Sequence, residues 1–303
     1  MDKLKGVKAL AFSSIMASLT IIFILFTTYL TGVGLISMIL LPMISSFVSL
    51  KVNYKYQLVY FCACLITFII DPALTLFIVI PSLISGIILG LLIGKYLQGY
   101  YIIFITSIIV SILQIGSTYL IKLLFEVDII HLFSIVLSID VLDFKSLYYF
   151  FIFILSIIQV SLSYIIITNE LKKLNFEFNE KKNQFINILI INALTIIIST
   201  VSFFISNTLY FLFLGFTIYF GVVLGYYIFS FYLKKSILII QLPLYFLSLL
   251  GFAILYPICG NDNSIIILLL PFFSQIITAL YIVIYQKCVK KGKINESLFD
   301  KLD

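Results

Sequence analysis

Long apolar runs separated by lysines limit most strongly how this chain of 303 residues can fold. Four lysine-free runs are 42, 39, 51 and 51 residues long, namely Ala9 to Leu50, Tyr56 to Gly94, Asn183 to Leu233 and Ser236 to Gln286. A bilayer core of about 30 Å needs roughly 20 apolar residues per helix, so each run is long enough for two crossings. The runs lack the two-residue alternation of barrel strands. Lipid admits only helices and closed barrels. Because the runs do not fit barrel strands, the sequence predicts an all-α, polytopic membrane protein.

Composition supports this class, since 63% of the residues are hydrophobic and 11% are charged. The nineteen basic residues are all lysines, and together with the abundance of Ile, Phe, Tyr and Asn they indicate an AT-rich bacterial genome. The lysines are dispersed between apolar runs instead of clustered with aromatic residues, which argues against a nucleic-acid partner. The lipid bilayer of a bacterial plasma membrane is therefore the expected partner.

The distribution of lysines predicts the orientation in that membrane. If each run is an antiparallel pair of helices, seventeen lysines fall on one side and only Lys122 and Lys145 fall on the other. Positive residues are enriched in cytoplasmic loops, so we expect both chain termini in the cytoplasm.

One more pair of helices is expected at residues 97 to 121 and 146 to 168. In the segment between them, a set of polar residues recurs at three- and four-residue intervals and shares one helical face: Asp128, His131, Ser134 and Ser138. This pattern predicts an amphipathic helix on the outer surface. The expected total is about ten transmembrane helices plus one outer interfacial amphipathic helix, with a short crossing at 57 to 70.

The most polar interior segment predicts a division into two membrane bundles. The expected organisation has four parts: a six-helix bundle at 1–168, a cytoplasmic linker at 169–184, a four-helix bundle at 185–287 and a cytoplasmic tail at 288–303.

Asp71 is the one carboxylate in the run from Tyr56 to Gly94, and it has two interpretations. Pro72 disfavours a helical conformation at the preceding residue, so Asp71 can cap the outer end of a tight hairpin. Alternatively, the short crossing before it holds the carboxylate below the interface, where acidic residues are costly and usually serve a functional site.

Residues for catalysis are sparse. The chain has a single histidine, His131, and no arginine. Its four cysteines form no CxxC pair, so neither a metal site nor a redox pair is indicated. We therefore expect no catalytic residues, no metal, no cofactor and no enzymatic activity.

Two stripes of small residues repeat at four-residue spacing: Ala9, Ser13 and Ala17 in the first helix, and Gly86, Gly90 and Gly94 in the fourth. Small residues let membrane helices approach closely. The stripes serve either packing within the bundle or docking of another membrane protein.

Single amides occur in five apolar helices: Gln114, Gln159, Asn192, Gln241 and Gln275. Each needs a hydrogen-bond partner inside the bundle, and interhelical bonding is one role for them. A solute pocket uses the same residue types, so these amides and Asp71 are the candidate substrate-binding residues.

Four segments carry a resemblance to a known family: "KALAFSSIMASL" (8–19), "LLPMISSFVSLK" (40–51), "PSLISGIILGLLIGK" (81–95) and "LLLPFFSQIITALYIVIYQK" (268–287). Together they resemble the YybS-like family of uncharacterised bacterial membrane proteins. The first part of that family is similar to the substrate-binding S components of energy-coupling-factor transporters. The resemblance implies a solute-binding bundle that docks through Ala9, Ser13 and Ala17 onto a membrane coupling subunit, with ATPases supplied in trans. The four helices expected after residue 184 exceed the six-helix plan of S components.

Three interpretations of function stay open. The first is a solute-binding or transport-associated membrane subunit without its own ATPase, whose solute the sequence does not identify. The second is a non-enzymatic scaffold or assembly factor of the cell envelope. The third is a membrane enzyme acting on lipid, against which the lack of arginine and of metal-ligand clusters argues.

Overall fold

The computed structural model describes residues 3–29, 34–95, 98–137, 141–174, 176 and 185–232, together with Leu247, Phe272, Phe273, Ile276 and Leu280. These ranges are built from helices and contain no strand. The chain divides into two compact units, Met1–Lys182 and Asn183–Asp303, which we treat separately.

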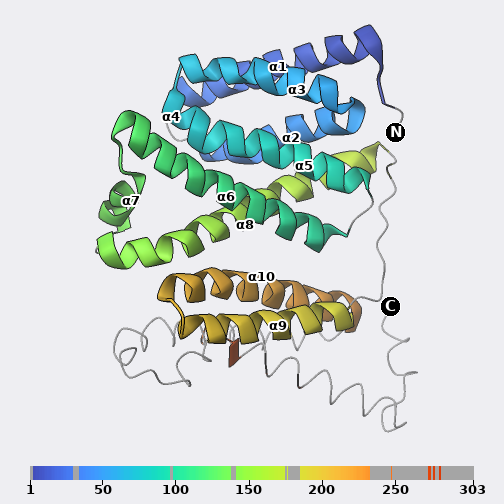
Figure 1. Ribbon diagram of the computed structural model, residues 1–303. Coiled ribbons are helices and arrows are strands. Elements are labelled where there is room, and N and C mark those ends of the chain that lie inside the picture. The colour runs from blue at the N-terminus through green and yellow to red at the C-terminus, as the bar shows by residue number, and fades with distance from the viewer. Residues whose placement is uncertain are drawn as a thin grey trace, which may run out of the picture. The chain divides into compact units, whose positions relative to one another are not determined.

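Unit 1 is an antiparallel helical bundle (Figure 1). Its elements follow in chain order: α1 (Gly6–Tyr29), α2 (Gly34–Lys51), α3 (Tyr54–Cys64), the 3-10 segment η1 (Leu65–Ile69), α4 (Pro72–Leu74), the π-helical segment η2 (Thr75–Val79), α5 (Ile80–Gly94), α6 (Gly99–Phe125), α7 (Ile129–Leu137) and α8 (Val141–Lys173). Segments α3 and η1 form one continuous helical stretch, as do α4, η2 and α5.

Five helical stretches are long and apolar enough to cross a membrane: Gly6–Tyr29, Pro72–Gly94, Gly99–Phe125, Leu147–Lys173 and Thr208–Tyr226. Shorter apolar helices cover Ser37–Lys51, Tyr54–Ile69 and Asn187–Phe203. The described chain is therefore helical and compatible with an integral membrane protein. Only five single residues are described between 236 and 286, where two crossings are expected, so the total of ten stays a prediction.

Helix α2 is central to unit 1, because it packs against α1, α5 and α8. Its contact with α5 is closest where two glycines of α5 face the α2 backbone. A Cβ atom added to Gly86 would lie 2.7 Å from Pro42 Cα, and one added to Gly90 would lie 2.6 Å from the Ser46 carbonyl oxygen. Ser49 Oγ also donates a hydrogen bond of 2.9 Å to the Ile87 carbonyl. The glycine stripe of α5 therefore packs inside the unit.

The π-helical segment η2 ends at Val79, two residues before Pro81, which is the second residue of α5. Proline has no backbone N–H and its ring crowds the carbonyl four residues earlier, which disrupts a regular helix. A locally widened turn accommodates both effects. The sequence therefore keeps Pro72–Gly94 as one helical stretch despite an internal proline.

Helix α7 exposes different side chains from those expected of the predicted amphipathic helix. His131 is exposed, but Ser134 is buried, and its hydroxyl donates to the His131 carbonyl at 2.8 Å. Phe133 packs instead against the buried cluster around Tyr148 and Ile152. The prediction that Ser134 shares an exposed polar face is wrong, because its own helix satisfies the hydroxyl. The exposed face is largely apolar, with Leu132, Ile135 and Val136.

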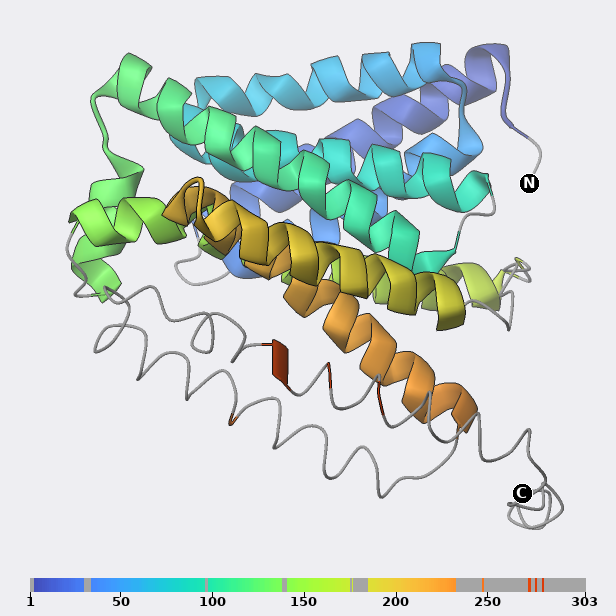
Figure 2. The same cartoon turned by 60° about the horizontal axis from the view of Figure 1, so that its bottom comes forward.

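Unit 2 contains the helical hairpin of α9 (Phe185–Phe203) and α10 (Asn207–Tyr232), which pack along each other (Figures 1 and 2). The turn between them is closed by backbone bonds from Ile205 and Ser206 to the Ser202 carbonyl, at 3.0 and 2.9 Å. The chain thus turns at residues 204–206, and α10 begins at Asn207.

Helix α8 continues to Lys173, five residues into the segment predicted to be a cytoplasmic linker. Glu170 and Lys173 form an ion pair of 2.6 Å three positions apart, a spacing that supports helix. Residues 169–173 of the predicted linker are therefore helical.

Candidate functional site

A polar strip follows the inner face of α6 in an otherwise apolar bundle. Its buried members recur at helical spacing: Thr106, Ser107, Ser111, Gln114, Ser117 and Thr118. Serine and threonine hydroxyls can donate to carbonyls of their own helix, and Ser111, Ser117 and Thr118 do so. Three members of the strip remain: Gln114, which bonds to other helices, and Thr106 and Ser107, which have no partner.

Gln114 lies at the centre of a hydrogen-bonded network between helices, and only 2% of it is exposed. Its Oε1 atom accepts a bond of 2.9 Å from Ser156 Oγ of α8. Its Nε2 atom donates a longer bond of 3.4 Å to Oε1 of Gln159, also on α8. The two glutamines that the sequence singled out in unit 1 are therefore brought together.

Gln159 extends this network to two further helices. Its Nε2 atom donates to Ser82 Oγ of α5 at 3.1 Å. One turn further along α8, Ser163 Oγ donates to the Ile39 carbonyl of α2 at 2.9 Å. Polar side chains consequently connect α2, α5, α6 and α8 in the interior of unit 1. We call Ser82, Gln114, Ser156 and Gln159 the amide network.

Thr106 and Ser107 lie two turns from Gln114 on the same inner face of α6, and neither is exposed. Their hydroxyl oxygens have no hydrogen-bond partner. An unpaired buried hydroxyl costs about 1 to 3 kcal/mol. These two groups are therefore free to bind a polar group of a ligand or a water molecule.

The chemistry of this region is that of neutral hydrogen bonding. Amides and hydroxyls both donate and accept hydrogen bonds, but they do not ionise near neutral pH. Within the described ranges, no group of three or more His, Cys, Asp or Glu side chains lies close enough to hold a metal ion. Neutral hydrogen bonding is therefore the chemistry that the amide and hydroxyl side chains of this region offer.

Asp71 caps the N-terminus of α4. Its backbone is extended, with φ −144° and ψ 96°, as expected for a residue before proline. Its Oδ1 atom accepts a bond of 2.9 Å from the Leu74 backbone N–H, and Pro72 occupies the first turn. This geometry favours the hairpin-cap interpretation, since the cap already employs one carboxylate oxygen. A role of Asp71 in substrate binding stays a prediction.

The three other predicted amides belong to the part of the sequence assigned to unit 2. Asn192 belongs to α9 in unit 2, where it is 3% exposed and neither side-chain atom has a partner. Gln241 and Gln275 lie outside the described residues. Their predicted roles are therefore untested.

The stripe predicted for partner docking faces the interior of unit 1. Ala9 and Ser13 are fully buried and Ala17 is 3% exposed. Ala9 and Ala17 belong to the core cluster that also contains Tyr60 of α3 and Leu41 of α2. This burial agrees with packing within the bundle, because side chains covered by α2 and α3 do not form an accessible docking face.

Sequence reasoning did not single out Ser82, Ser156, Thr106 or Ser107. A signal for the α6 pair was present, because Thr106, Ser107 and Gln114 share one helical face. No comparable signal distinguishes Ser82 or Ser156 from the many serines of neighbouring helices. Hydroxyls can satisfy themselves on their own helix, so a serine gives little information on its neighbours.

Comparison with known proteins does not assign the chain to a family. No protein-family model, no curated protein and no solved structure matches it. The similarity to the YybS-like family is accordingly an expectation from the sequence alone.

Proposed function

We propose that the chain is a multi-pass protein of the bacterial cell membrane whose first unit binds a small uncharged solute at the inner face of α6. One observation carries this proposal: the unpartnered hydroxyls of Thr106 and Ser107 are fully buried on α6, two turns from Gln114 of the amide network. Unpaired polar groups are unfavourable inside a membrane bundle, and polar residues there commonly line a solute path. Bound solute would supply the missing hydrogen-bond partners.

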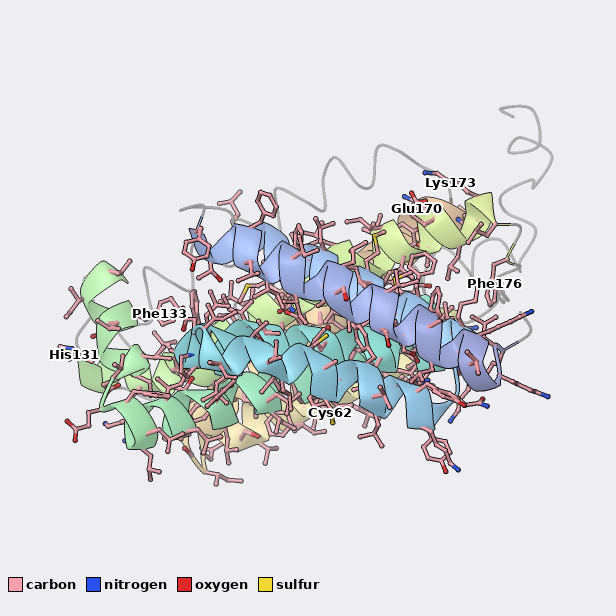
Figure 3. The ribbon with its side chains drawn as sticks, turned by 90° about the horizontal axis from the view of Figure 1, so that it is seen from above. Cys62, His131, Phe133, Glu170, Lys173 and Phe176 are labelled. Carbon is pink, nitrogen blue, oxygen red and sulfur yellow. The ribbon has the colours of Figure 1, made fainter. Side chains whose placement is uncertain are left out.

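The distribution of charge in unit 1 supports an orientation with the N-terminus in the cytoplasm. One end of the bundle carries the lysines that flank five helix ends: Lys3, Lys5, Lys8, Lys51, Lys55, Lys95, Lys172 and Lys173. Figure 3 shows Lys173 at this end and His131 at the opposite end. The opposite end has Lys122 and Lys145, accompanied by Asp71, Glu126 and Asp128. This asymmetry follows the positive-inside rule.

For transport of the solute, partner proteins would supply the energy in this proposal. The sequence contains no nucleotide-binding motif, so a membrane coupling subunit and ATPases would act in trans. Ala9, Ser13 and Ala17 do not contribute the docking surface in this proposal, because α2 and α3 cover them.

A second candidate function, a non-enzymatic envelope scaffold, is favoured by a different observation. Gln114 and Gln159 bond to each other and to Ser156 and Ser82. Such mutual satisfaction is expected of residues that hold helices together, with or without a ligand.

Native mass spectrometry of the purified chain in mild detergent separates the two candidates. Under the solute-binding proposal, the wild type retains a small molecule that the Thr106→Val and Ser107→Ala variants lose. Ser18→Ala, on the exposed face of α1, is the control and retains it. If the wild type carries no small molecule and both variants gain thermal stability, the hydroxyls are only unpaired groups and the scaffold function is supported.

A further inference from the structure

A cluster of lysines surrounds one hydrogen bond at the lysine-rich end of unit 1. The Leu4 backbone N–H donates to the Lys51 carbonyl at 2.8 Å, which fixes the chain before α1 against the end of α2. Lys3 and Lys5 are the neighbours of Leu4 in sequence, and Lys55 follows in the first turn of α3. We call Lys3, Lys5, Lys51 and Lys55 the basic cluster. One short contact thus gathers four positive charges from three segments.

A second contact holds the turn between α2 and α3 in place. Gln57 Nε2 donates to the carbonyls of Ser49 and Val52, each at 3.1 Å. Ser49 lies in the last turn of α2 and Val52 directly follows the helix, where orphan acceptors need partners. Because Gln57 is buried, this bond fixes the position of Lys55 relative to Lys51. The basic cluster therefore rests on an ordered backbone.

The basic cluster lacks neutralising carboxylates in the part of the chain that the structure describes. None of its four lysines takes part in either ion pair found there. At the lysine-rich end, Glu170 is the described carboxylate, and it is paired with Lys173. Lys3, Lys5 and Lys55 are exposed and Lys51 is half-buried. The positive charge is therefore available to an external anion.

An exposed apolar surface begins directly beside the basic cluster. On α1, Val7 is 82% exposed and Leu10 follows on the same helix. On α3, Tyr54 is 67% exposed and Leu58 lies one turn further. Since α1 and α3 are neighbours in the bundle, positive charge and apolar surface adjoin on the same two helices. A ligand that fits both must carry an anionic head next to a hydrocarbon tail.

We infer that the basic cluster binds the phosphate headgroup of an anionic phospholipid in the cytoplasmic leaflet, with the acyl chains lying along α1 and α3. Clustered lysines at the membrane surface attract anionic lipids. The tyrosine at position 54 suits the headgroup level, where amphipathic rings concentrate. This inference rests on the membrane location in the proposed function but is independent of solute binding.

A lipid fits these observations better than an acidic segment of a partner protein. An acidic peptide would satisfy the lysines but leave Val7, Leu10, Tyr54 and Leu58 exposed. A phospholipid meets both requirements with one molecule. The acidic partner is therefore one outcome of the test.

The test compares two triple variants of the full chain with equal loss of charge at the same end. Lys3→Gln, Lys5→Gln and Lys55→Gln remove three of the four charges of the basic cluster. The control variant carries Lys95→Gln, Lys172→Gln and Lys173→Gln. Native mass spectrometry with added phosphatidylglycerol or phosphatidylcholine measures the retained lipid. We expect the first variant to lose at least about tenfold in phosphatidylglycerol retention and the control to stay within about twofold.

Equal losses in both variants would show diffuse attraction to positive charge and would overturn the inference. So would equal retention of the two lipids by the wild type, or loss of a co-purified acidic protein without loss of lipid. A photoreactive phosphatidylglycerol keeps the test decisive if the triple variant does not fold. Crosslinks in the wild type should fall on residues 3–10 and 51–58, and crosslinks spread over the whole chain contradict the site. Solute retention, measured in the same spectra, reports on the proposed function separately.

Discussion

Gln159 and Ser82, which lie 77 positions apart, are joined by a hydrogen bond of 3.1 Å from Nε2 of the amide to the hydroxyl oxygen. This bond couples α8 to α5, and Gln159 also accepts from Gln114 of α6. A double-mutant cycle of Gln159→Ala and Ser82→Ala should therefore show a favourable coupling energy of roughly 0.6 to 1.7 kcal/mol. Unfolding in detergent measures it. In a control cycle of Gln159→Ala and the exposed Ser18→Ala, the two stability changes should simply add. If the changes of Gln159→Ala and Ser82→Ala also add, the interaction is contradicted.

Close packing of α5 on α2 predicts unequal effects of alanine at two glycines. Gly90→Ala places a Cβ atom 2.6 Å from the Ser46 carbonyl oxygen, so we expect overpacking to lower stability by about 1 to 3 kcal/mol. Gly116 has no heavy atom within 4 Å of the added Cβ position. Gly116→Ala should be neutral or stabilising by up to about 1 kcal/mol, because alanine favours helix. Thermal unfolding of both variants measures the difference, and equal stability of the two would contradict the close contact of Gly90 with α2.

Burial of Ser13 predicts that α1 does not tolerate a large residue there. Ser13→Leu should destabilise unit 1 by about 1 to 3 kcal/mol, since the position is fully buried. The adjacent Ser14 is exposed, so Ser14→Leu should change stability by no more than about 0.5 kcal/mol. Thermal unfolding in detergent measures both changes. A Ser13→Leu variant of normal stability that loses a co-purifying membrane protein would instead support docking through this stripe.

Asp128 predicts a dependence of stability on pH at the junction of α6 and α7. Lys122 Nζ donates to Asp128 Oδ2 at 2.6 Å, and this bond holds the pKa of Asp128 below its ordinary value. The His131 backbone N–H adds a second bond of 3.1 Å. A depressed folded-state pKa contributes stability above the unfolded value of about 3.9, and the contribution is lost as pH falls further through the folded-state pKa.

Both partners of this ion pair are partly exposed, so the contribution is at most about 1 kcal/mol. Asp128→Asn keeps a side chain that caps helices well, so it isolates the loss of charge. We expect it to be less stable than the wild type at pH 7, and we expect this difference to be smaller at pH 3. Thermal unfolding at the two pH values measures this difference, which should grow toward low pH if the interpretation is wrong.

The charge asymmetry of unit 1 predicts its orientation in the cell. In a chain whose native cysteines are replaced by serine, Lys145→Cys should react with an impermeant thiol reagent in intact cells. Lys55→Cys should react only after the membrane is opened, because it lies at the lysine-rich end. The reverse pattern of labelling would invert the proposed orientation.

Much of the helical arrangement was predictable, because lysines, turn residues and helix length act over short stretches of sequence. The boundary near Asp71 followed from proline chemistry, and the structure places a cap there. The direction of individual side chains was not predictable in the same way. Ser134 and Ser13 are polar but buried, since packing decides their direction and a hydroxyl fits inside a bundle. The pairing of Gln114 with Gln159 depends on contacts between distant helices, which periodicity does not encode.

The close contact of α2 with α5 also constrains how unit 1 can move. At Gly86 and Gly90 the two backbones approach so closely that neither lipid nor water fits between them, and Ser49 joins them by a hydrogen bond. The pair should consequently behave as one rigid body. Any motion that admits a molecule from the membrane or from water must then open a helix boundary other than the one between α2 and α5.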